Sequence, residues 1–115
     1  MDDIQRLTEK LVKFRDARDW AKFHKPKDVA ISLSLEAAEL LEHFQWKTDE
    51  EIKEYAKKHK QEISEELADV FNWVLILAKD LNIDIAAASA KKIALNGKKY
   101  PVSKSKGSAT KYNKL

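Results

Sequence analysis

The sequence predicts an all-α protein, a bundle of four to five helices in a single domain. Three observations lead to this prediction. Apolar residues recur three and four positions apart along most of the chain, which is the spacing of one helix face. Only two Gly and two Pro occur among 115 residues, too few for the many turns of a β fold. The chain has no Cys, so neither a disulfide nor a thiolate metal site contributes to the fold.

The first two helices are expected over Asp2–Trp20 and from Asp28 to about Trp46, with a connection between them that contains Pro26. Asp28 is the expected cap of the second helix. Apolar stripes at helical spacing define the inner face of each helix. These stripes are Ile4, Leu7, Leu11 and Phe14 in the first helix and Ile31, Leu35 and Ala38 in the second.

The next two helices differ sharply in polarity. A short polar helix is opened by Thr48 and Glu51, which have the spacing of a capping box. The fourth helix, Gln61–Leu81, is the most apolar, and over Leu67–Ala78 it is apolar around most of its circumference. So small a chain has too little surface of its own to cover such a helix. We therefore expect the bundle to be completed by oligomerisation, as a homodimer or a homotetramer.

The last helix is expected to run from Asp84, its cap, to about Gly97, and Pro101 prevents its continuation. We expect residues 1–101 to form one helical domain. Residues 102–115 are expected to form a basic, flexible tail, because they hold too few apolar side chains to build a core.

Charge is distributed unevenly along the chain. Residues 1–90 carry 19 acidic and 14 basic side chains, a net charge of −5, whereas residues 91–115 carry eight Lys and no acid, a net charge of +8. A basic end on an acidic body is typical of a solvated arm or of a nucleic-acid contact. It can equally hold a polyanionic small molecule whose metal is bound by the acidic part. Charge alone does not choose between these functions.

Two pairs of carboxylates lie on the helices that should form the core. Glu36 and Glu39, and likewise Glu66 and Asp69, are three residues apart, so each pair shares a helix face. Their neighbours are mostly apolar, and a charged carboxylate is costly to bury unless something neutralises it. All-oxygen ligands suit a hard divalent cation, Mg²⁺ or Mn²⁺. The alternative is that these acids are solvated and pair with Lys on outer helix faces.

The two acidic pairs, E-x-x-E at Glu36/Glu39 and E-x-x-D at Glu66/Asp69, resemble the signature of the all-α nucleoside triphosphate pyrophosphohydrolases, the MazG-like superfamily. Further segments resemble its dCTP pyrophosphatase branch and follow in the same order along nearly the whole chain. These segments are Phe14–Asp16, Arg18–Trp20, Phe23–Pro26, Phe44–Lys47, Lys92–Pro101 and Lys111–Tyr112. In one departure, residues 35–39 are L-E-A-A-E, whereas that branch usually has Gly around the first acidic pair, as in G-E-V-G-E. Alanine keeps the helix, and the change bears on base preference.

The resemblance implies Mg²⁺-dependent hydrolysis of a nucleoside triphosphate, dCTP or a modified dCTP, to the monophosphate and pyrophosphate. The four acids would hold the metal, and one of them, Glu39 being the first candidate, would orient or deprotonate the attacking water. The residues implied to face the triphosphate are Lys92, Asn96, Lys99 and Tyr100. Side chains able to stack on a base or bond its edge are Trp20, His24, Trp46 and Trp73. Trp73 has an alternative role as a core or interface aromatic.

Other functions are weighed against this one. None of the three His follows a Glu by three positions, which argues against a di-iron bundle. A nucleic-acid-binding protein that uses the lysine-rich tail is disfavoured, because unmetallated acids would repel phosphate. A non-catalytic oligomerisation module stays open. The acidic, amphipathic N-terminus is no signal peptide and no apolar run could span a bilayer, so we expect a cytoplasmic protein without a membrane partner.

Overall fold

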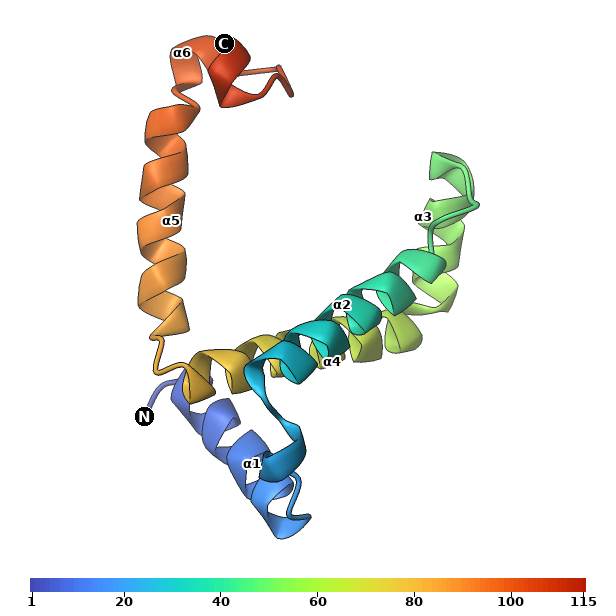
Figure 1. The fold of residues 1–115 in the computed structure, drawn as a ribbon. Coiled ribbons are helices and arrows are strands. Elements are labelled where there is room, and N and C mark those ends of the chain that lie inside the picture. Colours follow the sequence, from blue (N-terminus) through green and yellow to red (C-terminus); the bar gives the residue numbers. More distant parts are fainter. The chain divides into compact units, whose positions relative to one another are not determined.

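The computed structural model describes residues 1–115, and it confirms the all-α class: every regular element is helical. The elements in chain order are α1 (Asp3–Ala17), a 3₁₀ turn (Ala21–Phe23), α2 (Pro26–Glu42), α3 (Asp49–Lys58), α4 (Lys60–Asp80), α5 (Ile85–Lys99), α6 (Val102–Ser105) and a second 3₁₀ turn (Tyr112–Lys114) (Figure 1). The chain divides into two compact units, Met1–Asn82 and Ile83–Leu115. No helix combines the length and the apolarity that crossing a bilayer would require.

The first unit is organised around α4. Helix α2 packs along α4, α1 packs against the later part of α4, and α3 meets α4 near its start (Figure 1). The fully buried core is small and lies where α2 meets the later turns of α4. It consists of Val29, Leu75, Ile76 and Ala78. The pairing of α2 with α4 matters most for function, because these two helices carry the predicted acidic pairs.

Two of the predicted helix starts are confirmed by their caps. The Thr48 hydroxyl accepts a hydrogen bond from the Glu51 backbone N–H at 3.2 Å, and the Glu51 carboxylate accepts one from the Thr48 N–H at 3.1 Å. These bonds favour the charged carboxylate and lower the pKa of Glu51. At the start of α5, the Asp84 carboxylate accepts a hydrogen bond from the Ala87 N–H at 3.0 Å. Each cap satisfies backbone donors that the helix itself leaves unpaired.

The predicted ends of the second helix were wrong at both sides. Helix α2 begins at Pro26, with Lys25 as its N-cap, so Asp28 lies in the first turn instead of capping it. Proline suits the first helical position because its fixed φ is already helical and its missing N–H would have no partner there. The helix ends at Glu42, and the residues up to Trp46 form turns.

Other helix boundaries also differ from the prediction. Helix α1 ends at Ala17, before Trp20, and Asp19 has a positive φ of 56°. Such a left-handed residue ends a helix, and Asp tolerates this conformation better than most residues. Helix α5 continues past Gly97 to Lys99. The segment after it forms a short sixth helix and a 3₁₀ turn, so the regular structure extends into the predicted tail.

The inner face predicted for the second helix was wrong for the single chain. Ile31 is 49% exposed and Leu35 is 61% exposed. The inward stripe of α2 instead contains Val29 and Glu36, which are buried or half-buried. Both stripes have helical spacing, and periodicity alone does not decide which of two apolar stripes packs within the chain. The stripe left outside is therefore available for contact with another surface.

Candidate metal and nucleotide site

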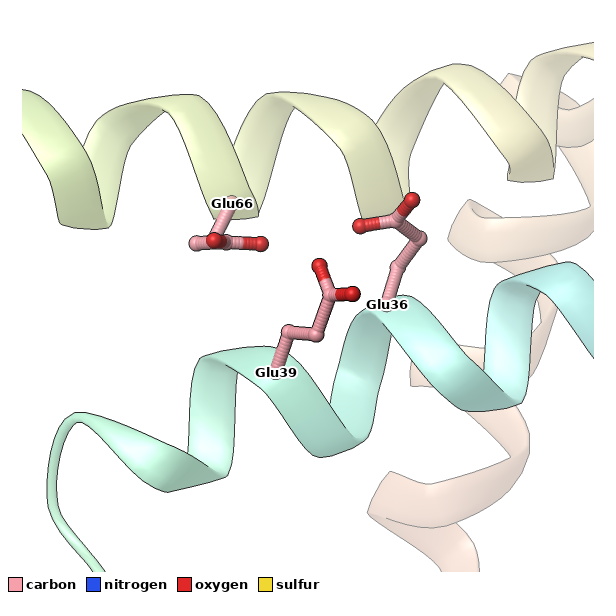
Figure 2. Close-up of side chains that lie close together, drawn as sticks. All are labelled: Glu36, Glu39 and Glu66. Atoms are coloured by element: carbon pink, nitrogen blue, oxygen red, sulfur yellow. The ribbon is translucent and has the colours of Figure 1, made fainter.

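Three carboxylates converge between α2 and α4. Glu36 and Glu39 point from α2 towards α4, and Glu66 faces them from α4 (Figure 2). Each offers an oxygen, and these oxygens all lie within 4.8 Å of one another. The spacing of three residues on α2 places its two acids on adjacent turns of one face, as the sequence suggested. Asp69, the fourth predicted acid, lies one turn after Glu66 and is exposed.

The Glu36 carboxyl is held in surroundings that disfavour its charge. Burial is the largest cause that raises its pKa, followed by a hydrogen bond with Glu39. The negative charges of Asp69, Glu39 and Glu66 raise the pKa further. The charge of Asp69 therefore acts on the cluster, although its oxygens are not among the three that converge.

The pKa of Glu66 is raised for the same reasons, with burial first and a hydrogen bond with Glu39 second. The charges of Glu39 and Asp69 add to the rise, and the nearby His43 opposes it. His43 is the C-cap of α2, and its Nδ1 lies 2.7 Å from the hydroxyl oxygen of Tyr55 on α3. This hydrogen bond joins α3 to the end of the helix that carries Glu39.

The cluster lacks the partners that normally accompany buried acids. The Oε2 atoms of Glu36 and Glu66 are buried and accept no hydrogen bond. No Lys or Arg forms an ion pair with any of the four acids, because the ion pairs of this chain lie elsewhere. Buried carboxylate oxygens without partners are costly, and a hard divalent cation would satisfy them. The donor set therefore fits Mg²⁺ or Mn²⁺.

This arrangement predicts an unusual dependence of stability on pH in the absence of metal. Because the pKa values of Glu36 and Glu66 are raised above the ordinary 4.5, folding favours their protonated forms. That contribution is complete below about pH 4.5 and is lost as the pH rises through the raised values. In EDTA, we expect Glu36→Gln to melt at a higher temperature than the wild type at pH 7.5, and the gap to shrink at pH 5.

Thermal melts of both proteins at the two pH values measure this effect. Adding Mg²⁺ should raise the melting temperature of the wild type more than that of Glu36→Gln, since only the wild type keeps the full ligand set. A gap of equal size at both pH values would contradict the proposed repulsion.

A pocket of about 510 Å³ adjoins the carboxylates within the first unit. Its volume falls in the range of small-molecule sites. Helices α1, α2 and α4 and the segment between α1 and α2 supply its lining. The lining residues are Leu7, Lys10, Leu11, Phe14, Arg15, Trp20, His24, Glu36, Asp69, Asn72, Trp73 and Ile76. Two of the four predicted metal-binding acids, Glu36 and Asp69, thus line one cavity with a largely aromatic and apolar wall.

Three of the predicted base-pocket residues meet in this cavity: Trp20, His24 and Trp73. The His24 ring packs edge-on against Trp73, with centroids 5.2 Å apart and planes at 74°. The Nδ1 atom of His24 is buried and has no hydrogen-bond partner. A flat ligand with a polar edge would satisfy this nitrogen and could stack on the indole faces.

The remaining predicted residues lie elsewhere. Trp46 is 86% exposed in the turn after α2 and does not line the pocket, so its role stays a prediction. Lys92, Asn96, Lys99 and Tyr100 belong to the second unit, on α5 and its C-cap. Within that unit, Lys99 Nζ lies 4.9 Å from the ring centroid of Tyr112, and the Tyr100 and Tyr112 rings are 6.0 Å apart.

Sequence reasoning missed several residues of the pocket wall. Phe14 and Arg15 line the cavity from α1, and Asn72 lines it from α4. Phe14 was part of a predicted apolar stripe, and both α1 residues belong to a segment that resembles the family. A site signal was thus present in the sequence. That these residues line a pocket depends on how α1 packs against α4, which the sequence pattern does not specify.

Comparison with known proteins identifies the family. Residues 31–115 match the MazG-like family. The chain belongs to this family. It is 38% identical over 117 aligned residues to dCTP pyrophosphatase 1 of Rattus norvegicus, covering all of the chain and 67% of the rat protein. With dCTP pyrophosphatase 1 of Homo sapiens it shares 34% identity over 117 residues, again covering all of the chain and 67% of the relative.

A solved structure supports the same assignment. A pyrophosphatase from Archaeoglobus fulgidus DSM 4304 is 40% identical, with a TM-score of 0.84 over 88% of this MazG-like chain and 94% of that one. The family expected from the acidic motifs is therefore confirmed. These relatives are pyrophosphatases by name, which also confirms the expected enzyme class, a nucleotide diphosphatase.

Proposed function

We propose that this MazG-like protein is a Mg²⁺-dependent nucleoside triphosphate pyrophosphohydrolase whose substrate is dCTP or a modified dCTP. One observation carries the proposal: the unpartnered carboxylate of Glu36 belongs to a cluster of three converging acids and also lines an apolar and aromatic pocket of about 510 Å³. The reaction adds water to the triphosphate and yields the monophosphate and pyrophosphate. The names of the relatives support the choice of dCTP.

Four acids would hold the metal: Glu36, Glu39, Glu66 and Asp69. Bound there, Mg²⁺, or Mn²⁺ in its place, would neutralise charge on the phosphate oxygens and lower the pKa of a nearby water. The oxygen donors on two facing helices support this assignment, because hard cations prefer such ligands. Supplying the two unpartnered Oε2 atoms with a ligand would also remove the cost of their burial.

Glu39 is our candidate for orienting the attacking water. It is the exposed member of the three converging acids, and its oxygen lies within 4.8 Å of an oxygen of each of the other two. Its carboxylate would accept the proton of the water while the water oxygen forms a bond to the α-phosphorus. The bond from the α-phosphorus to the bridging oxygen would break, and pyrophosphate would leave with that electron pair.

The aromatic pocket would hold the nucleoside. Trp20 and Trp73 offer faces for stacking on the base, and His24 Nδ1 offers an unpaired nitrogen to its edge. The resemblance to the family supports a triphosphate-binding role for four cationic and polar side chains of α5 and its C-cap. These are Lys92, Asn96 and Lys99, which stand four and three residues apart on one face of α5, and Tyr100, the C-cap.

Pyrophosphate release from single deoxynucleoside and ribonucleoside triphosphates tests the proposal. We expect release with Mg²⁺, none with EDTA, and the highest kcat/KM for dCTP or a 5-modified dCTP. No nucleic acid is added. If no triphosphate is hydrolysed, the proposed function is wrong. The protein would then be better described as a nucleic-acid-binding protein that uses its lysine-rich tail, or as a non-catalytic oligomerisation module.

Residues 102–115, the tail, contact two of the side chains that we propose to bind the triphosphate. Tyr112 packs against Tyr100 and lies under Lys99 Nζ, so the tail restrains two of the proposed phosphate-binding residues. We propose that residues 102–115 close over bound triphosphate.

Truncation after Val102 should raise KM or lower kcat several-fold, while the melting temperature stays within about 2 °C, because the tail adds no core. Lys106→Ala removes one tail charge without either contact and serves as the control. Unchanged kinetic constants in the truncated protein would refute the closing tail.

A further inference from the structure

Arg15 is a cation in the nucleotide pocket that the proposed mechanism does not use. Its side chain is only 12% exposed, and its Nη1 donates to Asp80 Oδ2 at 2.8 Å, near the end of α4. Its Nε is buried and makes no hydrogen bond. The nearest other carboxylate oxygen, Oδ1 of Asp16, is 4.0 Å from Nε, beyond hydrogen-bond distance.

The ion pair with Asp80 leaves one edge of this guanidinium without a hydrogen bond, although the Asp16 carboxylate lies at ion-pair distance from Nε. Nε–H and the adjacent Nη2–H point the same way, and neither atom donates to the protein. A buried N–H without a partner is destabilising, and a ligand acceptor would satisfy it. Because Asp80 fixes Nη1, the free edge is held in one orientation before any ligand binds.

Arg15 lies on α1, and its ion-pair partner Asp80, at the end of α4, is distant along that helix from the acidic cluster. The pocket residues of α4 begin at Asp69, near the acidic cluster, and end at Ile76. Asp80, the ion-pair partner of Arg15, lies one turn beyond Ile76 on the same helix. With a rise of about 1.5 Å per residue, Ile76 stands about 10 Å along the axis from Asp69. A nucleotide whose phosphates are at the acids would extend its base past Trp73 towards Arg15.

We propose that Arg15 determines base specificity by donating from its Nε–Nη2 edge to two adjacent acceptors on the base. This inference rests on the proposed function for the identity of the ligand as a nucleotide. A guanidinium has donors only, and its paired donors match two neighbouring acceptor atoms. Cytosine presents O2 and N3 as adjacent acceptors. Uracil and thymine carry N3–H instead, so a donor would face a donor and the pair would be rejected.

Arg15→Lys is the direct test, because lysine keeps the charge and its reach to Asp80 but loses the fork of two donors. We expect the ratio of kcat/KM for dCTP over dUTP to fall about tenfold or more, because kcat/KM for dCTP decreases. One good bidentate pair of hydrogen bonds provides discrimination of this size. The matched control is Arg18→Lys. Arg18 lies over the Phe14 ring at 3.6 Å, does not line the pocket, and should leave the ratio unchanged. An equal loss on both nucleotides in Arg15→Lys would make Arg15 a structural residue and overturn the proposal.

A second measurement needs no folded variant and no turnover. Binding of dCMP, dUMP and the 3-deaza analogue of dCMP to the wild type can be followed by the fluorescence of the pocket residues Trp20 and Trp73. The 3-deaza analogue has a C–H in place of N3, so we expect it and dUMP to bind about tenfold or more weakly than dCMP. Equal binding of all three would refute the role of Arg15. If the wild type releases no pyrophosphate yet shows this binding order, the proposed function fails and the base-reading role stands.

Discussion

Glu39→Gln and Asp69→Asn should each lower the rate of pyrophosphate release by about 100-fold or more while the helical fold persists. Loss of residues that merely support metal ligands already costs 10- to 100-fold in comparable sites, and these two acids belong to the proposed ligand set itself. Each change replaces a charged oxygen donor by an amide of the same size. It therefore weakens Mg²⁺ binding without creating a cavity, and it relieves part of the repulsion that raises the pKa of Glu36.

The two variants separate the roles of the acids. Glu39 belongs to the three oxygens that converge within 4.8 Å, whereas Asp69 contributes its charge and lines the pocket. Saturating Mn²⁺ should restore part of the activity of Asp69→Asn, because weaker metal binding is its main defect. It should restore less in Glu39→Gln, which has also lost the proton acceptor.

Glu65→Gln is the matched control for these variants. Glu65 neighbours Glu66 on α4 but is exposed and accepts a hydrogen bond from Gln61 at 3.1 Å, outside the cluster. Its loss should leave kcat and the Mg²⁺ dependence unchanged. Turnover like that of the wild type in both Glu39→Gln and Asp69→Asn, at matched metal content, would refute the four-carboxylate site.

The acidic site was accessible from the sequence because each pair is local. Spacing of three residues on a helix fixes a shared face whatever the rest of the chain does, so Glu36 and Glu39 were correctly grouped. That Glu66 faces them depends on how α2 packs against α4. Periodicity did not supply this pairing. The resemblance to the MazG-like family did, and in the structure three of the four acids converge.

The pocket wall was predicted less completely, because its residues come from helices distant in sequence. Trp20, His24 and Trp73 were expected from side-chain chemistry and do meet in the cavity. Arg15 lies in a segment that resembles the family, but side-chain chemistry did not assign it to the pocket, since an arginine on an amphipathic helix is normally solvated. Its burial accompanies a contact with Asp80, which lies 65 residues further along the chain. No local sequence pattern encodes such a long-range contact.

The choice of inner face on α2 failed for a related reason. The helix carries two apolar stripes, and the one that packs on α4 includes Val29 and the charged Glu36. Hydrophobicity favoured the other stripe, because it contains no acid. The fold places the acid inward, against hydrophobic preference, as expected where function rather than stability sets the residue.

The outward stripe of α2 leads to the second large expected effect, on assembly. Ile31 and Leu35 on α2, with Leu67 and Phe71 on α4, are large apolar side chains left exposed in the single chain. Only four hydrophobic side chains are fully buried. Burying each exposed large apolar residue would contribute about 1.5–3 kcal/mol, a sizeable addition for a domain with so small a core.

We therefore expect this protein to be a homodimer or homotetramer whose dilution leads to unfolding and not to a stable folded monomer. Sedimentation velocity and circular dichroism over the same dilution series measure mass and helicity together. Leu35→Lys should raise the dissociation constant by about tenfold or more, which corresponds to about 1.4 kcal/mol, because it places a charge in the stripe. Val102→Lys, at a residue 76% exposed on α6 and outside the stripe, should have no such effect. A folded monomer of 13.2 kDa at low micromolar concentration would show that the exposed stripe is not an interface between copies of this chain.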